Sequence, residues 1–284
     1  MLISIASGKG GTGKTTVATN LALSLECDVQ LLDCDVEEPN SHLFIKPKIE
    51  EEISITTPVP EVDMQKCSLC GKCADICQFN AIVVIAETVL PFHELCHSCG
   101  GCMEVCPEKA ITETTRDLGI IERGRKNGLE FVHGLLRIGE AMAPPLIRKV
   151  REYTNSDSVT IIDAPPGTSC PVIASMKDVD LVLLVTEPTP FGLHDLKLAI
   201  GAVRVLGIPC ALVINRSDMG DDQVREYAKK ENIPLLLEIP FDRRIAEAYS
   251  RGDMIVDVMP EWRLKFQELY SNIQKIVDHK EALS

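Results

Sequence analysis

Aromatic side chains and positive charge are both scarce in this chain of 284 residues. Phe, Tyr and Trp make up 4% of the residues, and the formal net charge is -13. Proteins that bind nucleic acids use a basic surface to hold phosphates and aromatic rings to stack on bases. The composition therefore argues against nucleic acid as a partner.

Long apolar runs are missing as well. No stretch reaches the ~18 apolar residues that a membrane-spanning helix needs. Residues 1–11, MLISIASGKGG, enter a strand and then a glycine-rich loop at once, which leaves no room for a secretory signal peptide. We therefore expect a cytoplasmic protein without stable membrane insertion.

Cysteine, in contrast, is abundant, with 12 residues. Thiols stay reduced in the cytoplasm, so metal ligands or free thiols are expected more than disulfides. Eight of the cysteines form two copies of one pattern. The other four are scattered along the chain: Cys27, Cys34, Cys170 and Cys210.

Short apolar runs alternate with segments of helical periodicity through most of the chain. The runs, read as buried strands, are 2–7, 29–35, 158–167, 179–188, 208–216 and 233–240; the helical segments are 14–26, 191–207 and 221–232. This alternation predicts an α/β fold with a mostly parallel sheet covered by helices on both faces. Ligands of such sheets bind at the carboxyl ends of the strands.

The alternation stops between about residues 46 and 115. Residues 46–63 are rich in proline and charge and suggest a linker that leads into an insert, and residues 114–134 suggest strands that return to the sheet. We predict one α/β domain over residues 1–60 and 113–284, with a small inserted module at 61–112.

The C-terminal segment 261–280 is amphipathic. Its apolar residues are spaced for one helical face: Trp262, Phe266, Leu269, Ile273 and Ile276. A helix lying on a membrane surface would have a basic polar face, whereas acids and bases are balanced here. The pattern favours a helix packed on the sheet.

Residues 8–15, GKGGTGKT, fit the phosphate-binding pattern G-x4-G-K-[ST] between a predicted strand and a predicted helix. Glycines let backbone N–H groups converge on phosphate oxygens, and the helix N-terminus adds positive potential. Lys14 is expected to bridge the β- and γ-phosphates of ATP, and Thr15 to hold Mg²⁺. The predicted nucleotide-binding residues of this loop are Gly8, Gly10, Gly11, Thr12, Gly13, Lys14, Thr15 and Thr16.

An additional lysine, Lys9, makes the loop resemble the deviant Walker A motif, K-G-G-x-G-K-T, of the MinD/ParA superfamily. Nitrogenase iron protein and the Mrp-type ATPases belong to that superfamily. The resemblance implies a nucleotide-dependent homodimer in which Lys9 reaches the partner's phosphates and stabilises transition-state charge. It also implies an ATPase that is weak alone and stimulated by a partner.

The resemblance covers about residues 1–45 and 120–270. It implies that Asp35, in the position of the family's switch I region, orients the attacking water, and that Asp163, in TIIDAPPGT, holds Mg²⁺ through water. Residues implied to contact the γ-phosphate or lie around the base are Gly167, Asn215, Pro240 and Asp242.

The repeated cysteines follow the spacing C-x2-C-x2-C-x3-C, which is typical of bacterial two-cluster ferredoxins. In that pattern three neighbouring thiolates hold one cluster and the fourth ligates the other. One predicted [4Fe–4S] cluster is thus held by Cys67, Cys70, Cys73 and Cys106, and the second by Cys96, Cys99, Cys102 and Cys77. Zinc sites usually pair two C-x2-C hooks, so the pattern favours clusters over zinc.

The second cassette has Pro107 after its last cysteine, as the ferredoxin pattern does, whereas the first has Gln78. The pattern therefore does not predict the backbone geometry of the turn after Cys77.

As a whole, the chain resembles MinD-superfamily ATPases with an inserted ferredoxin domain. We weigh three functions: ATP-gated electron transfer to an acceptor protein, iron–sulfur cluster assembly or delivery, and a redox-sensing positioning ATPase. For Cys170 two interpretations remain: a buried or free thiol, or a cluster ligand or redox contact.

Overall fold

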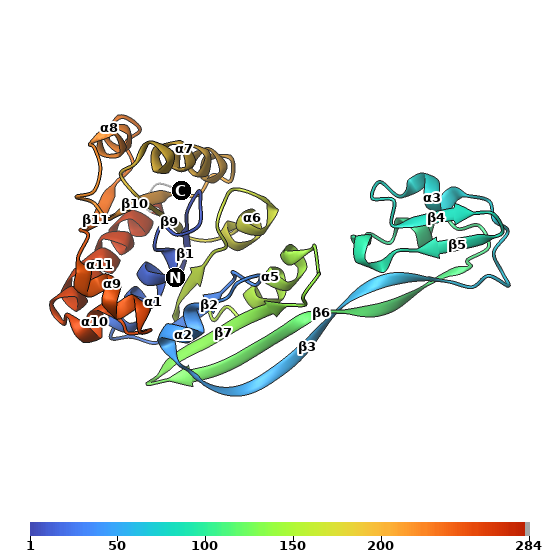
Figure 1. Ribbon diagram of the computed structural model, residues 1–284, viewed down its shortest axis with the longest axis horizontal. Coiled ribbons are helices and arrows are strands. Elements are labelled where there is room, and N and C mark those ends of the chain that lie inside the picture. Colours follow the sequence, from blue (N-terminus) through green and yellow to red (C-terminus); the bar gives the residue numbers. More distant parts are fainter. Residues whose placement is uncertain (282–284) are drawn as a thin grey trace. The chain divides into compact units, whose positions relative to one another are not determined.

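The computed structural model describes residues 1–281 and divides into two compact units (Figure 1). Unit 1 combines residues 1–52, 121–135 and the chain from 147 onward, and unit 2 combines residues 53–120 and 136–146. In the described part of the chain, no helix is both long and apolar enough to cross a membrane.

A sheet ordered β11-β10-β9-β1-β8-β2-β7-β6-β3 forms the framework. Neighbouring strands from β11 to β7 pair in parallel. Their bounds are β1 (Leu2–Ala6), β2 (Val29–Asp33), β7 (Leu129–Leu136), β8 (Val159–Asp163), β9 (Leu181–Thr186), β10 (Cys210–Asn215) and β11 (Leu235–Ile239). The predicted α/β fold with a mostly parallel sheet is confirmed.

Helices flank the sheet of unit 1. They are α1 (Lys14–Ser24), α2 (Ser41–Ile45), α5 (Ala143–Arg151), α6 (Cys170–Met176), α7 (Pro190–Val205), α8 (Gln223–Lys230), α9 (Arg243–Ser250), α10 (Ile255–Val258) and α11 (Glu261–Glu281). One core cluster joins apolar residues of β1, β2, α1 and α11. The C-terminal helix is packed as predicted, because Trp262, Phe266 and Ile273 are buried in that cluster.

Residues 46–63 do not form the predicted linker. They contain instead a 15-residue strand, β3 (Lys48–Val62), at the edge of the sheet. Proline is tolerated on an edge strand because one side of the strand has no hydrogen-bonding partner. Pro58 and Pro60 therefore do not prevent strand formation.

The chain returns to the sheet along β6 (Ile111–Lys126), as expected for residues 114–134. A two-residue turn, Asn127–Gly128, then joins β6 to β7, and both turn residues have positive φ angles of 50° and 88°. An Asn-Gly pair in this conformation is the favoured connection of a hairpin. Both β3 and β6 have one part in each unit, so the chain passes between the units along these two strands. It crosses again near the end of β7 and within α5.

Unit 2 has few regular elements: α3 (Lys72–Ile76), β4 (Ile82–Ile85), β5 (Thr88–Pro91), η1 (His93–Leu95) and α4 (Gly101–Glu104). Its small core consists of Cys73, Ile82, Val89 and Ile111, with further cysteines packed against it. The insert predicted at 61–112 lies inside this unit. The unit extends beyond those bounds because it also includes parts of β3 and β6, the loop that follows β7 and the first turn of α5.

Candidate functional site

The first candidate site lies at the carboxyl ends of the parallel strands in unit 1. The glycine loop follows β1, Asp33 ends β2, Asp163 ends β8 and Asn215 ends β10. Parallel strands that pair in this order bring their carboxyl ends to one edge of the sheet. Residues that are far apart in the sequence therefore meet there.

The glycine loop has a backbone that only glycine adopts easily. Gly11 and Gly13 have φ angles of 77° and 96°, in the left-handed region. A Cβ atom on Gly13 would also lie 2.5 Å from Asn215 Nδ2. Helix α1 begins at the next residue, Lys14, and its first N–H groups have no partner within the helix. Such N–H groups favour a bound anion.

A hollow of about 440 Å³ lies beside this loop. Of the predicted residues, it is lined by Gly10, Gly11, Gly13, Lys14, Thr15, Thr16, Asp35, Asn215, Pro240 and Asp242. Gly8, Lys9, Thr12, Asp163 and Gly167 are not among its lining residues. Phe241 and Tyr249 also line it. Nothing in the sequence pattern points to Tyr249, which lies near the end of α9.

Two buried carboxylates lie next to each other at the centre of this edge. Asp33 and Asp163 are paired in register on β2 and β8. The Asp33 carboxylate accepts hydrogen bonds from the backbone N–H groups of Asp35, Asn40 and Ser41, at 3.1, 3.2 and 3.0 Å. These bonds hold the segment 33–41, which we call the switch segment.

Asp163 is only 1% exposed, and its Oδ2 accepts a hydrogen bond from Ser41 Oγ at 3.0 Å. Within the described residues, the other carboxylate oxygen, Oδ1, is buried and has no hydrogen-bonding partner. A buried oxygen without a partner is costly, and a divalent cation or its bound water would satisfy it. The residues around Asp163 therefore fit Mg²⁺. Sequence reasoning did not identify Ser41, which carries no motif.

The acidic groups of this edge disfavour one another's ionisation. Burial and the neighbouring Asp163 charge raise the pKa of Asp33 well above its usual range, and burial also raises the pKa of Asp163. Burial raises the pKa of Asp35 to about 6, and the Asp163 charge adds to that increase, whereas Lys14 opposes it. The site thus concentrates negative charge that a cation would relieve.

Asn215 and Asp242 already have partners in the protein. Asn215 Nδ2 donates to the Thr12 carbonyl oxygen at 2.9 Å, and its Oδ1 accepts from the Arg216 N–H at 3.0 Å. Asn215 therefore fastens the glycine loop to β10, which leaves one N–H and one lone pair for a base. Asp242 caps α9 by accepting from the Arg244 N–H at 2.8 Å.

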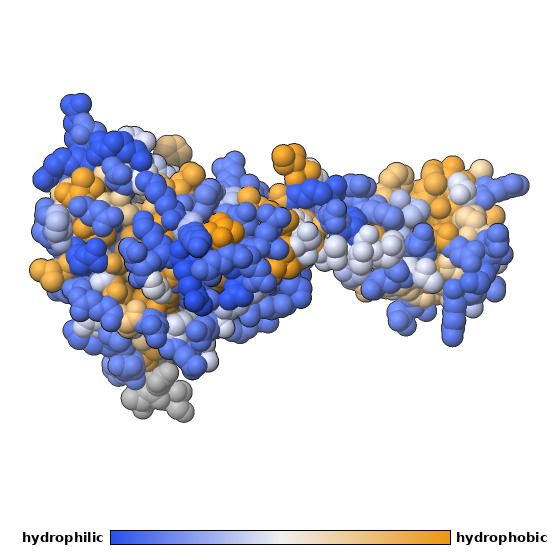
Figure 2. Space-filling view, turned by 90° about the horizontal axis from the view of Figure 1, so that it is seen from below, coloured by the Kyte–Doolittle hydropathy of each residue, from blue (hydrophilic) through white to orange (hydrophobic). Residues whose placement is uncertain are grey.

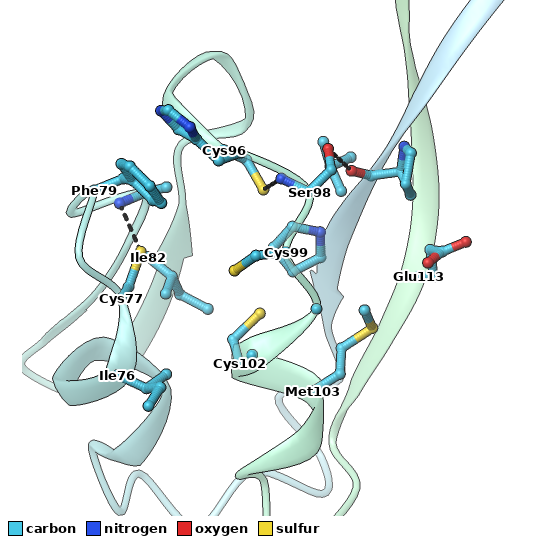
Figure 3. Close-up of a pocket in the computed structure, with 17 residues that line it drawn as sticks. Ile76, Cys77, Phe79, Ile82, Cys96, Ser98, Cys99, Cys102, Met103 and Glu113 are labelled. Carbon is cyan, nitrogen blue, oxygen red and sulfur yellow. Dashed lines mark hydrogen bonds between the residues drawn. The ribbon is translucent and has the colours of Figure 1, made fainter. Parts of the chain in front are cut away.

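The second candidate site consists of two sets of thiols in unit 2. One hollow is lined by Cys67, Cys70, Cys73 and Cys106, and another by Cys77, Cys96, Cys99 and Cys102. Figure 3 shows the thiols of the second set around a common space. Each set combines three cysteines of one cassette with the last cysteine of the other. This partition is the one that the ferredoxin spacing predicts; cluster ligation itself stays a prediction.

The two cassettes have the same backbone conformation 29 residues apart. Leu69 and Ser98 both have φ of 56°, an uncommon value for residues other than glycine. Their N–H groups donate to Cys67 Sγ and Cys96 Sγ, each at 3.4 Å. The strained conformation thus directs an N–H group at a sulfur in both copies.

The last cysteine of each cassette is also matched. The Ala81 N–H donates to Cys77 Sγ at 3.3 Å, and the Ala110 N–H donates to Cys106 Sγ at 3.2 Å. Replacement of proline by Gln78 therefore does not change this turn. N–H groups directed at sulfur favour the thiolate, which is the form that binds iron.

The remaining cysteines lie outside the two thiol sets. Among the side chains described, residues 1–279, no three of His, Cys, Asp or Glu lie close enough together to hold one metal ion. Cys170 is exposed at the start of α6. Burial raises the pKa of the Cys210 thiol, and it raises that of Cys34 well above its ordinary value. Burial thus disfavours the thiolate form of both residues.

Apolar side chains are exposed on unit 2 (Figure 2). Ile76 and Phe79 line the second thiol hollow and are 46% and 43% exposed. The Phe79 ring stacks on His97, with ring centroids 3.4 Å apart. Exposed apolar groups of this kind are typical of protein-binding surfaces.

Residues 3–255 match the family model described as the CobQ/CobB/MinD/ParA nucleotide binding domain. An uncharacterized protein of Methanocaldococcus jannaschii is 31% identical over 98% of both chains. A protein of Aquifex aeolicus named iron-sulfur cluster carrier protein is 26% identical over 98% of this chain and 68% of its own. The cell division ATPase MinD of Pyrococcus furiosus has the same fold, with a TM-score of 0.61 at 22% identity over 97% and 98% of the two chains.

The raised pKa of Asp35 predicts a pH-dependent cost to stability. The folded protein binds the Asp35 proton more tightly than the unfolded chain, so ionisation costs stability above the folded-state pKa and nothing below the unfolded-state value. Asp35→Asn should raise the free energy of unfolding by roughly 1–3 kcal/mol at about pH 8, and the gain should vanish near about pH 4.

Urea unfolding of the nucleotide-free protein at the two pH values measures this difference. Glu37→Gln, which changes an exposed acid of the same segment, is the matched control and should have little effect. An equal gain for Asp35→Asn at both pH values would show that the charge of Asp35 is not the cause.

Proposed function

Because the chain belongs to the CobQ/CobB/MinD/ParA nucleotide-binding family, we propose that it hydrolyses ATP to control electron transfer through two [4Fe–4S] clusters held by unit 2. The observation that carries the proposal is the partition of eight thiols into two sets that each cross between the cassettes. The fold alone supports only the nucleotide-binding part.

The chemistry at the nucleotide site is an in-line attack of water on the γ-phosphate. Lys14 and the N-terminus of α1 would bind the phosphates, and Thr15 and Asp163 would hold Mg²⁺. Asp35, which lines the hollow, orients the water. Lys9 of a second copy neutralises charge that develops in the transition state. A nucleotide-dependent homodimer is therefore part of the proposal.

The thiols of unit 2 fit [4Fe–4S] clusters by their number, partition and N–H donors. Cys67, Cys70, Cys73 and Cys106 would hold the first cluster, and Cys96, Cys99, Cys102 and Cys77 the second. When bound, such clusters supply one-electron transfer. The exposed apolar side chains of Ile76 and Phe79 beside the second set offer a binding surface to an acceptor protein.

A chain of contacts connects the nucleotide site with strand β6. Ser41 binds Asp163, and the next residue, His42, packs its ring against His133 on β7, with centroids 5.1 Å apart. His133 Nε2 in turn lies 2.6 Å from a carboxylate oxygen of Glu122 on β6. Strand β6 continues into unit 2. A change of the switch segment on hydrolysis would thus be transmitted to a strand that supports the thiol sites.

Cluster assembly or delivery is the second candidate function. Relatives named iron-sulfur cluster carrier protein favour it, including those of Aquifex aeolicus and Pyrococcus abyssi, at 26% and 25% identity. Against it stands the closed arrangement of the thiols, because eight ligands in two crossed sets hold clusters more tightly than donation requires. The two functions share the same ATPase chemistry and differ in what leaves unit 2.

Metal analysis tests the thiol sites. Protein purified without oxygen should contain about eight iron atoms per chain, and Cys106→Ser should lose roughly half of them. Cys170→Ser is the matched control, because this exposed cysteine lies outside both sets. Zinc in place of iron, or full iron content in Cys106→Ser, would contradict the proposed ligation.

Mixing experiments with one probe protein separate the two functions. The probe is a small [4Fe–4S] ferredoxin in two forms: a loaded form that holds its oxidised cluster, and an empty form without iron. The reduced protein and ATP are added to each form separately. Electron transfer predicts reduction of the loaded probe, faster with ATP than with ADP, while the protein retains its iron. Gain of iron by the empty probe without reduction of the loaded one would establish delivery instead.

A further inference from the structure

Three neighbouring strands bring two cations to one buried carboxylate. The strand order β10-β9-β1 places Arg216, Glu187 and Lys9 next to one another, each just after its strand. Glu187 is 8% exposed. Its Oε2 lies 3.4 Å from Lys9 Nζ, and its Oε1 lies 2.7 Å from a guanidinium nitrogen of Arg216. The lysine expected to act on a partner's phosphates is therefore paired within its own chain.

The backbone that carries Glu187 is fixed. The Glu187 carbonyl oxygen accepts a hydrogen bond from the Thr189 N–H at 2.8 Å, and a Cβ atom on Gly192 would collide with the same oxygen. Thr186 Oγ1 donates to the Gly192 carbonyl oxygen at 3.1 Å. The start of α7 thus packs tightly on this turn and fixes the backbone position from which the Glu187 side chain extends.

Arg216 is held in place independently of Lys9. Its φ of 50° is unusual for a residue other than glycine, and its N–H group donates to Asn215 Oδ1 at 3.0 Å. Asn215 is in turn bonded to the glycine loop through the Thr12 carbonyl oxygen. These bonds fix the backbone of Arg216, and its guanidinium group pairs with Glu187 without any contact to Lys9.

This second cation decides whether Lys9 can leave. Removing the only partner of a buried charge costs about 3–5 kcal/mol, because the remaining charge is unpaired. With Arg216 at 2.7 Å, Glu187 keeps a partner after Lys9 has moved. The arrangement retains the lysine and also allows its release.

We propose that Glu187 is a positioning residue that holds Lys9 in the monomer, and that Arg216 replaces Lys9 when a second copy offers its nucleotide phosphates. The inference rests on the proposed function, in which Lys9 acts across a homodimer. Glu187 then sets the protein concentration at which ATP-bound dimers form, because each dimer must first break two Lys9–Glu187 pairs.

Three variants test the role of Glu187. Glu187→Gln removes the carboxylate charge that retains Lys9. The dissociation constant of the dimer formed with a non-hydrolysable ATP analogue should therefore fall about fivefold, which corresponds to about 1 kcal/mol. Arg216→Gln should shift the dissociation constant in the opposite direction, because Lys9 becomes the sole partner of Glu187. The double variant should behave like Glu187→Gln alone, since no carboxylate remains.

Analytical ultracentrifugation measures the dissociation constants, and ATP hydrolysis as a function of protein concentration gives a second readout. Glu187→Gln should reach half-maximal turnover at a protein concentration about fivefold lower. Glu238→Gln is the matched control, because it breaks a surface ion pair between Glu238 on β11 and Arg225 on α8. It should leave the dissociation constant unchanged.

The outcomes separate this inference from the proposed function. A dimer that is unchanged or weaker in Glu187→Gln overturns the role of Glu187, as does a double variant that resembles Arg216→Gln. If Glu187→Gln does not fold, Glu187→Asp keeps the charge, withdraws it from Lys9 and should also strengthen the dimer. If Lys9→Ala hydrolyses ATP at the normal rate, the cross-dimer role of Lys9 fails, whatever the Glu187 variants show.

Discussion

The two buried carboxylates at the ends of β2 and β8 are the constraint on which the nucleotide site depends. Asp33 and Asp163 lie side by side in register, and burial together with their mutual repulsion makes ionisation costly. Hydrogen bonds from one segment offset part of this cost. Three backbone N–H groups donate to Asp33, and the Ser41 hydroxyl donates to Asp163. The switch segment is therefore placed by charge, and a cation at Asp163 Oδ1 would alter the balance that holds it.

The same constraint gives the position of the insert a physical meaning. The switch segment leads through α2 into β3, and β3 leads to the first cysteine cassette. On the return path, Glu122 of β6 is bonded to His133, whose ring packs on His42 of α2. Strands β3 and β6, which both pass from one unit into the other, are thus connected to the segment that binds Asp163. This arrangement favours control by the nucleotide over two independent activities in one chain.

Local sequence patterns predict the parts of this molecule that depend on local chemistry. The glycine loop, the parallel strands and the partition of the cysteines follow from residue type and spacing, because each needs a particular backbone or ligand at a fixed offset. The conversion of 46–63 into the long strand β3 depends instead on pairing at a sheet edge, where prolines are tolerated. The contact of Lys9 with Glu187, 178 residues away, depends on strand order, which no local pattern of Glu187 reveals.

Hydrogen exchange of β6 tests most directly the claim that the nucleotide site controls unit 2. Amide exchange of residues 111–126 would be followed by mass spectrometry with no nucleotide, with ADP and with a non-hydrolysable ATP analogue, each with Mg²⁺. The account predicts that the ATP analogue changes protection along β6 relative to ADP, and that His133→Phe, which removes the bond to Glu122, abolishes the difference. Identical exchange of β6 in all three nucleotide states would contradict it.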